Sequence, residues 1–135
     1  MSEAARLAAV LDAMPYARRL GVGGHFEDGV LVAVLPFSPD LIGNPRLPAL
    51  HGGAVGAFLE LAAQMRLRFD REGLAAPATI GVTVEYLRPG RARETYARAE
   101  IKRLGRRIAN LHVEAWQDQN RTPIALLQGR FLLPD

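Results

Sequence analysis

The sequence predicts an α+β fold in which one long, buried helix packs against an antiparallel sheet. Residues 53–70 form a helical run that is apolar around most of its circumference. The residues after it read as four strands separated by short turns. Strands joined by short turns pair antiparallel, and such a helix needs a surface that buries it. The 135 residues contain no cysteine and match a single domain, 1–135, that needs no disulfide.

A short amphipathic helix is expected first, within residues 1–14. Leu7, Val10, Leu11 and Met14 fall at helical spacing. The segment lacks the charged-then-apolar order of a signal peptide, and nowhere does the chain hold a run of about 18 apolar residues. We therefore expect a cytoplasmic protein with no membrane span.

The other elements follow from alternation and from turn residues. Along the chain we expect a strand at 29–37, a structured loop at 39–50, the long helix to residue 70, a break at 71–79, and strands at 79–87, 93–103, 107–117 and 122–133. In the strand at 79–87, the alternation puts Ile80, Val82, Val84 and Tyr86 on one face.

Glu60 is the one carboxylate in the apolar stretch 51–64. An unpaired charge in a buried helix is costly, so Glu60 needs a partner or a task. Its neighbours at helical spacing include Gly56, Ala57 and Gln64, and the small ones leave space for a backbone or a ligand to approach. Glu60 is therefore either a catalytic base or nucleophile, or one half of a salt bridge to an arginine across a subunit interface.

His51, Gly52 and Gly53 lead into the helix. The first N–H groups of a helix lack intrahelical acceptors, and the helix dipole favours negative charge there. Such an N-terminus can polarise a carbonyl and hold a developing oxyanion. The other interpretation is that the glycines serve only the backbone geometry of helix entry.

The sequence offers little for other kinds of catalytic or cofactor-binding site. The sequence has no G-x-S-x-G motif, no phosphate-binding glycine loop and no cysteine nucleophile. His25, His51 and His112 do not stand at a known metal-ligand spacing, so we expect no metal. What remains is the Glu60 carboxylate, the helix N-terminus and Asn44 in the preceding loop.

Positive charge is concentrated between residues 88 and 107, in a chain of net charge +3. The cluster contains Arg88, Arg91, Arg93, Arg98, Lys102, Arg103, Arg106 and Arg107. It suits a phosphate-bearing partner, and it equally suits a solvated sheet face.

The segment N-P-R-L-P-A-L-H-G-G-A-V-G-A-F-L-E-L-A-A, followed by V-E-Y-L-R-P and R-L-G-R-R, resembles the PaaI-like (4-hydroxybenzoyl-CoA thioesterase) type of hotdog-fold acyl-CoA thioesterase. The resemblance covers roughly residues 15–133. It implies a long helix wrapped by an antiparallel sheet, and two subunits whose sheets join edge to edge. Active sites then lie at the dimer interface.

The resemblance also assigns roles within that site. Glu60 acts on the thioester as base or nucleophile, where Asp is the more usual residue. A backbone N–H of the His51 entry polarises the thioester carbonyl, which points to Gly53 with Gly52 beside it. Asn44 assists, and Gln64 stands where Thr or Ser often holds water.

The expected function is hydrolysis of an aryl, short- or medium-chain acyl-CoA by a homodimer or a dimer of dimers (homotetramer). CoA is part of the substrate, no separate cofactor is implied, and neither nucleic acid nor a membrane is an expected partner. Arg88, Arg106 and Arg107 are the candidates for the CoA phosphates. The alternatives are a non-catalytic module that binds acyl-CoA or acyl-carrier protein, and a hotdog dehydratase. The acid after His-Gly-Gly argues against the dehydratase.

Overall fold

A computed structural model of the chain describes residues 1–46, 48–71 and 73–134, without the side chain of Asn44. Two short helices come first, α1 (Glu3–Asp12) and α2 (Pro15–Leu20), followed by strands β1 (Gly23–Glu27) and β2 (Val30–Leu35). A 3-10 turn η1 (Pro39–Leu41) and a small hairpin of β3 (Ile42–Asn44) and β4 (Ala49–Leu50) lead into the long helix α3 (Gly52–Asp70). Four strands complete the chain: β5 (Ala78–Tyr86), β6 (Thr95–Leu104), β7 (Ile108–Trp116) and β8 (Pro123–Leu132).

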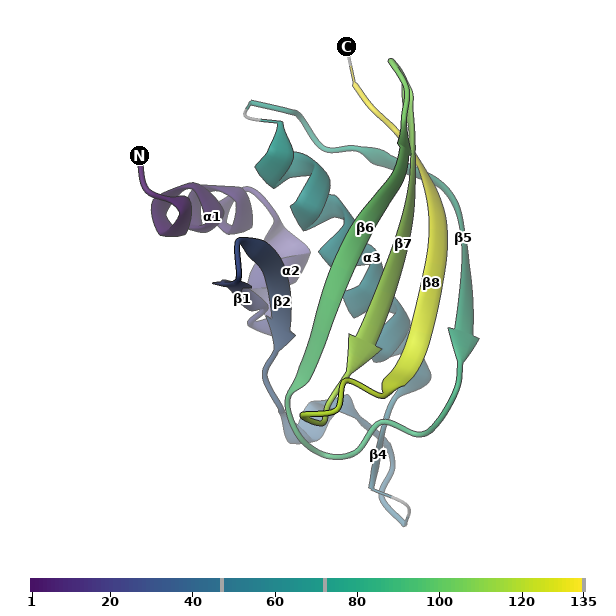
Figure 1. The fold of residues 1–135 in the computed structure, drawn as a ribbon. Coiled ribbons are helices and arrows are strands. Elements are labelled where there is room, and N and C mark those ends of the chain that lie inside the picture. The colour runs from purple at the N-terminus through teal and green to yellow at the C-terminus, as the bar shows by residue number, and fades with distance from the viewer. Residues whose placement is uncertain (47, 72, 135) are drawn as a thin grey trace.

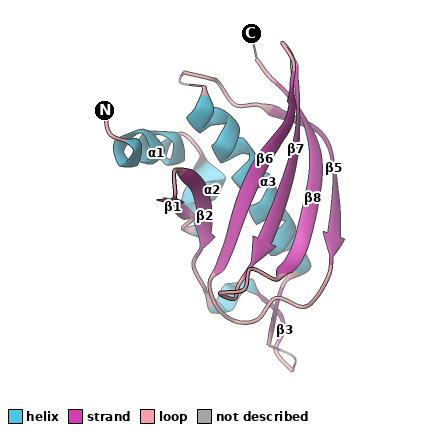
Figure 2. Cartoon of the chain, in the orientation of Figure 1, coloured by secondary structure: helices cyan, strands magenta, loops and turns pink. Residues whose placement is uncertain are grey.

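The main sheet is antiparallel and has the strand order β1-β2-β6-β7-β8-β5. It curves around α3, which lies along one of its faces, while α1 and α2 lie beside the β1–β2 end (Figures 1 and 2). These elements confirm the expected long helix on an antiparallel sheet. The strand after the helix, however, pairs with β8 and not with β6, its successor in the chain. β5 thereby becomes one edge of the sheet.

The core lies between α3 and the concave face of the sheet. Phe58, Leu59 and Met65 of α3 are fully buried there, against side chains such as Leu111 and Phe131. Many positions of the sheet that face the helix are alanine: Ala97, Ala99, Ala109, Ala115 and Ala125 are all buried. Small side chains at these positions let the sheet approach the helix closely and wrap around it.

Gly129 of β8 is required by the same core. A Cβ atom there would lie 2.8 Å from a ring carbon of the fully buried Phe131 and 3.1 Å from a methyl group of Val82. Because the Phe131 ring is held by packing, only glycine fits without a shift of the core.

Three expectations about the elements are corrected. The chain 39–50, expected as a loop, carries η1 and the β3–β4 hairpin in its described residues. The strand β1 was not expected, because Gly23, Gly24 and His25 give it no apolar alternation. Ile80 does not continue the alternation of β5, because the register shifts between Thr79 and Gly81 and leaves Ile80 as the extra residue of a bulge.

Candidate active site

At the N-terminus of α3, the Gly52 N–H is the backbone donor that no described residue engages. His51 is the N-cap, in extended conformation with φ −61° and ψ 130°, and its Nδ1 accepts from the Gly53 N–H at 2.9 Å. The N–H groups of Ala54 and Val55 both donate to the His51 carbonyl. Among the described residues, the Gly52 N–H has no acceptor. The expected donor Gly53 is therefore occupied in this conformation, and Gly52 presents the available N–H.

Tyr86, at the end of β5, holds this helix terminus against the sheet. Its hydroxyl donates to the Gly52 carbonyl at 2.7 Å, and a Cβ at Gly56 would stand only 2.9 Å from that hydroxyl. Gly52 and Gly56 therefore give Tyr86 room to lie across the first turn of α3. The sequence placed Tyr86 only on a sheet face, since no local pattern connects it with the first turn of α3, which lies 34 residues earlier in the chain.

Glu60 lies on a side of α3 that the chain itself leaves partly uncovered. Gly52 and Gly53 are exposed, and Gly56, Ala57, Glu60 and Gln64 are half-buried. These residues form one stripe along α3, and the small side chains around Glu60 leave it open, as the sequence predicts. Within the described part of the chain, Glu60 makes no hydrogen bond or ion pair. Its carboxylate is thus available to water, a substrate or a second protein chain.

Gly52 and Glu60 do not meet within one chain. Eight helical residues separate them, a rise of about 12 Å along the axis. The carboxylate of Glu60 cannot span that distance and remain in contact with a carbonyl group that is bound at the helix terminus. The expectation that the acid acts beside the N-terminus of its own helix is therefore not met by a single subunit.

A pocket of about 370 Å³ opens beside the N-terminus of α3. Gly52, Tyr86 and Arg88 contribute to its wall, and Leu50, Val55, Leu87 and Ile124 make it largely aliphatic. Of the predicted site residues, the structure thus brings Gly52 and Arg88 together at one pocket.

Arg106 and Arg107 are far from this pocket. They lie in the turn between β6 and β7, at the other end of β6 from the segment that follows β5 (Figure 1). β6 contains 10 residues, which corresponds to roughly 33 Å of strand. Within one chain, these two arginines and Arg88 do not form a single phosphate site.

Asn44 and Gln64 have less defined surroundings. Asn44 ends β3, where its backbone pairs with Ala49, but its side chain lies outside the described part of the chain. Gln64 is half-buried one turn beyond Glu60 and has no hydrogen-bond partner among the residues that the structure covers. No group of three or more His, Asp or Glu residues in the described ranges can hold a metal ion. None of the helices there is long and apolar enough to cross a membrane.

Comparisons with known proteins identify the family of the chain. The family model for the acyl-CoA thioesterase N-terminal domain matches residues 44–132. A curated relative, the medium/long-chain acyl-CoA thioesterase YigI of Salmonella typhimurium, is 29% identical over 120 residues, which cover 75% of this chain and 74% of that protein.

Solved structures give the same fold. A protein from Chromobacterium violaceum is 39% identical, with a TM-score of 0.73 and coverage of 96% of this chain and 90% of that chain. The Escherichia coli PaaI protein from the phenylacetic acid degradation operon is 21% identical, with a TM-score of 0.78 and coverage of 99% and 97%. A Bacillus halodurans protein solved with CoA is 24% identical, with a TM-score of 0.73 and coverage of 96% and 91%. The expected hotdog fold is confirmed.

Proposed function

The chain belongs to the acyl-CoA thioesterase family and is a thioester hydrolase, and we propose that its active site is shared between two copies of the chain. In this proposal, the Gly52 N–H of one subunit polarises the thioester carbonyl, and Glu60 of the partner subunit acts on the carbonyl carbon. The separation of Gly52 and Glu60 along α3 is the observation that carries the proposal. Enzymatic activity makes the non-catalytic binding module the weaker interpretation.

The edge strand β5 supports the pairing of two copies. Its outer edge is unpaired in one chain, and Ile80, Val82 and Tyr86 are 49%, 38% and 56% exposed. A nine-residue edge with exposed apolar side chains is a surface that a protein normally covers. We propose that β5 pairs antiparallel with β5 of a second copy, with two-fold symmetry. Antiparallel pairing reverses the direction of the second α3, so that the Glu60 side of one helix faces the N-terminal half of the other.

The chemistry follows from these two groups. Glu60 removes a proton from a water molecule, and the water oxygen forms a bond to the thioester carbon. The negative charge that develops on the carbonyl oxygen is held by the Gly52 N–H at the positive end of the helix dipole. The carbon–sulfur bond then breaks, and CoA leaves as a thiolate that takes up the proton held by Glu60, with a free carboxylic acid as the second product. Gln64, one turn beyond Glu60, is in position to hold the water.

The substrate we propose is a medium-chain or longer aliphatic acyl-CoA. The curated relative acts on medium- and long-chain acyl-CoA, and the wall of the pocket beside Gly52 contains four aliphatic side chains and one aromatic one. For the CoA phosphates we propose Arg88 at the pocket. Arg106 and Arg107 can contribute only from the partner subunit, whose sheet runs in the opposite direction.

Glu60→Gln tests the chemistry. The variant keeps the shape and polarity of the side chain but cannot take up the proton, so kcat for decanoyl-CoA falls by about a hundredfold or more. Near wild-type hydrolysis would remove Glu60 from the mechanism. In H₂¹⁸O with enzyme in excess over substrate, direct attack by water gives labelled decanoate in the first turnover. Unlabelled product would instead make Glu60 a nucleophile.

Mixed dimers test whether two subunits share each active site. One subunit carries Glu60→Gln and the other Gly52→Pro, which removes the backbone donor. If the site is shared, each heterodimer contains one site with both defects and one intact site. Random mixing then restores about a quarter of wild-type activity, because half of the dimers are mixed and half of their sites are intact. If each subunit worked alone, the mixture would be as inactive as its parents.

A further inference from the structure

Gln117, the residue directly after β7, holds the backbone of the loop between β5 and β6. Its Oε1 accepts from the Arg91 N–H at 2.8 Å, and its Nε2 donates to the Arg91 carbonyl at 2.9 Å. The amide of this side chain therefore pairs with Arg91 as a residue of a neighbouring strand would. Nε2 also donates to Oγ1 of Thr95 at 3.1 Å, and Thr95 is fully buried at the start of β6. Both ends of the half-buried amide are thus engaged.

The loop held in this way, residues 87–94, forms part of the pocket beside the N-terminus of α3. Residues 88–90 line that pocket. The Gly90 carbonyl accepts from the Leu50 N–H at 2.8 Å, and Arg91 forms a bridge to β4. Because β4 ends directly before the N-cap of α3, the loop lies against the strand that leads into the helix terminus of the candidate active site.

The conformation of this loop depends on hydrogen bonds to its backbone. Of its residues, only Gly90 is buried, and a segment that buries few side chains opens easily when its backbone contacts are lost. The N–H groups of its first two residues donate to the Ile124 carbonyl. Gln117 holds the part of the loop that follows the pocket wall. The wall is therefore fixed from both sides.

We propose that Gln117 is a positioning residue of the hydrolase, which touches no substrate itself but keeps the pocket wall in the form that binds substrate. The inference rests on the proposed use of this pocket. The wall holds no reacting group, so it contributes equally to binding of the ground state and of the transition state. Gln117→Ala therefore raises KM for decanoyl-CoA by about tenfold and leaves kcat nearly unchanged. A decanoyl thioester of pantetheine is affected as strongly, because the change alters the wall and removes no phosphate contact.

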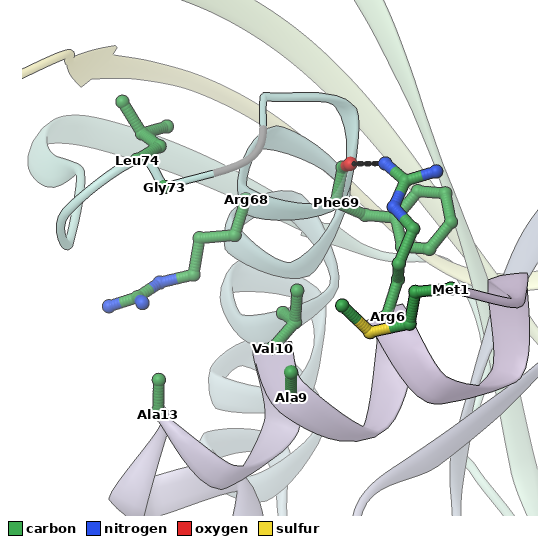
Figure 3. A pocket seen from close by; sticks show the side chains of 9 residues that line it. All are labelled: Met1, Arg6, Ala9, Val10, Ala13, Arg68, Phe69, Gly73 and Leu74. Carbon is green, nitrogen blue, oxygen red and sulfur yellow. Dashed lines mark hydrogen bonds between the residues drawn. The ribbon is translucent and has the colours of Figure 1, made fainter.

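Another side chain that binds backbone, at the far end of α3, provides the structural control. Arg6 of α1 donates from Nη2 to the Phe69 carbonyl at 2.7 Å and lies 4.3 Å from the centre of the Phe69 ring (Figure 3). Phe69 follows Gly52 by 17 helical residues, about 25 Å along the helix axis. Arg6→Met therefore removes a comparable anchor without reaching the pocket. It should lower the melting temperature and leave substrate binding unchanged.

Binding is measured by calorimetry with S-decyl-CoA, a thioether that the enzyme cannot hydrolyse. Gln117→Ala should raise the Kd by about tenfold. Gln117→Glu keeps the size of the side chain and the acceptor for the Arg91 N–H but has no donor at pH 8, so it should also weaken binding. Gln119→Ala, in the same turn, removes an exposed side chain that makes no hydrogen bond in the described part of the chain, and should change nothing. Hydrogen exchange of the Arg91 N–H should accelerate in Gln117→Ala only.

Three results would overturn the positioning role. They are an unchanged Kd in both Gln117 variants, an equal loss of binding in Gln119→Ala or Arg6→Met, and a fall in kcat with KM unchanged. Failure of S-decyl-CoA to bind the wild-type protein would overturn the use of the pocket and this inference with it. Because the thioether is bound without turnover, a Glu60→Gln variant that still hydrolyses substrate would refute the proposed mechanism and leave these binding results standing.

Discussion

Replacing Gly52 by proline removes one N–H from the proposed site and little else. Gly52 is the first residue of α3, where an N–H has no intrahelical acceptor and where proline is favoured. His51 before it has ψ 130°, which is the conformation that a residue preceding proline prefers. The backbone therefore already has the form that proline requires. The folded state should lose no hydrogen bond.

The size of the effect follows from the role assigned to this donor. Loss of one oxyanion donor raises the barrier by about 2.7–4 kcal/mol, so kcat for decanoyl-CoA falls by about 10²–10³ while the melting temperature changes by only a few degrees. The assay follows the free thiol of released CoA with a colorimetric disulfide reagent.

Gly52→Ala is the matched control, because it adds a Cβ but keeps the N–H. That Cβ would lie 3.6 Å from a ring carbon of Tyr86, an ordinary contact, so kcat should stay within a few-fold of wild type. Equal losses in the alanine and proline variants would mean that shape, not the donor, matters. An unchanged kcat in Gly52→Pro would refute the assignment and return the role to the Gly53 N–H, with His51 turned away.

Three further predictions concern the dimer, CoA and the core. Ile80→Glu places a charge on the exposed edge strand, so light scattering should show monomers at micromolar concentration and hydrolysis should be lost; a dimer with full activity would contradict edge pairing through β5. Neutralising Arg106 and Arg107 together should raise KM for acyl-CoA with kcat nearly unchanged, and should not affect a pantetheine thioester, whereas equal effects on both substrates would mean that this turn is only a solvated surface. Gly129→Ala should lower the free energy of unfolding by about 1–3 kcal/mol in urea titrations, since the added methyl meets the buried Phe131 ring; an unchanged stability would show that the core relaxes there.

Local patterns account for the elements that the sequence predicted. The apolar run of α3 and the alternation of β6, β7 and β8 follow from periods of about 3.6 and 2 residues, which depend on neighbours in the chain. The β1–β2 hairpin also has a local signal in the sequence. Asp28 and Gly29 at its turn have φ of 51° and 79°, as an Asp-Gly turn between two strands favours. The strand β1 itself is hard to predict, because it has too few apolar residues to show the alternation of a strand.

In the candidate site, too, local sequence features predicted some residues, whereas the role of others depends on the tertiary structure. Glu60 and the His-Gly-Gly entry could be selected from the sequence, because a lone carboxylate in an apolar helix and a glycine-rich helix start are local features. The sequence could not show which glycine offers the free N–H donor, because that depends on the rotamer of His51 and on its hydrogen bond with the Gly53 N–H.

By itself, the sequence determined the long helix, the strands that wrap it, the acid within it and the membership of a thioesterase family. The tertiary structure decided that β5 pairs with β8 and becomes an edge, that Tyr86 lies across the first turn of α3, and that Gln117 binds the backbone of the loop after β5. The physical reason is that each of these depends on contacts between residues far apart in the chain. Hydrophobic periodicity tells which face of an element is buried, but several partners can bury the same face, and only the packed chain selects among them.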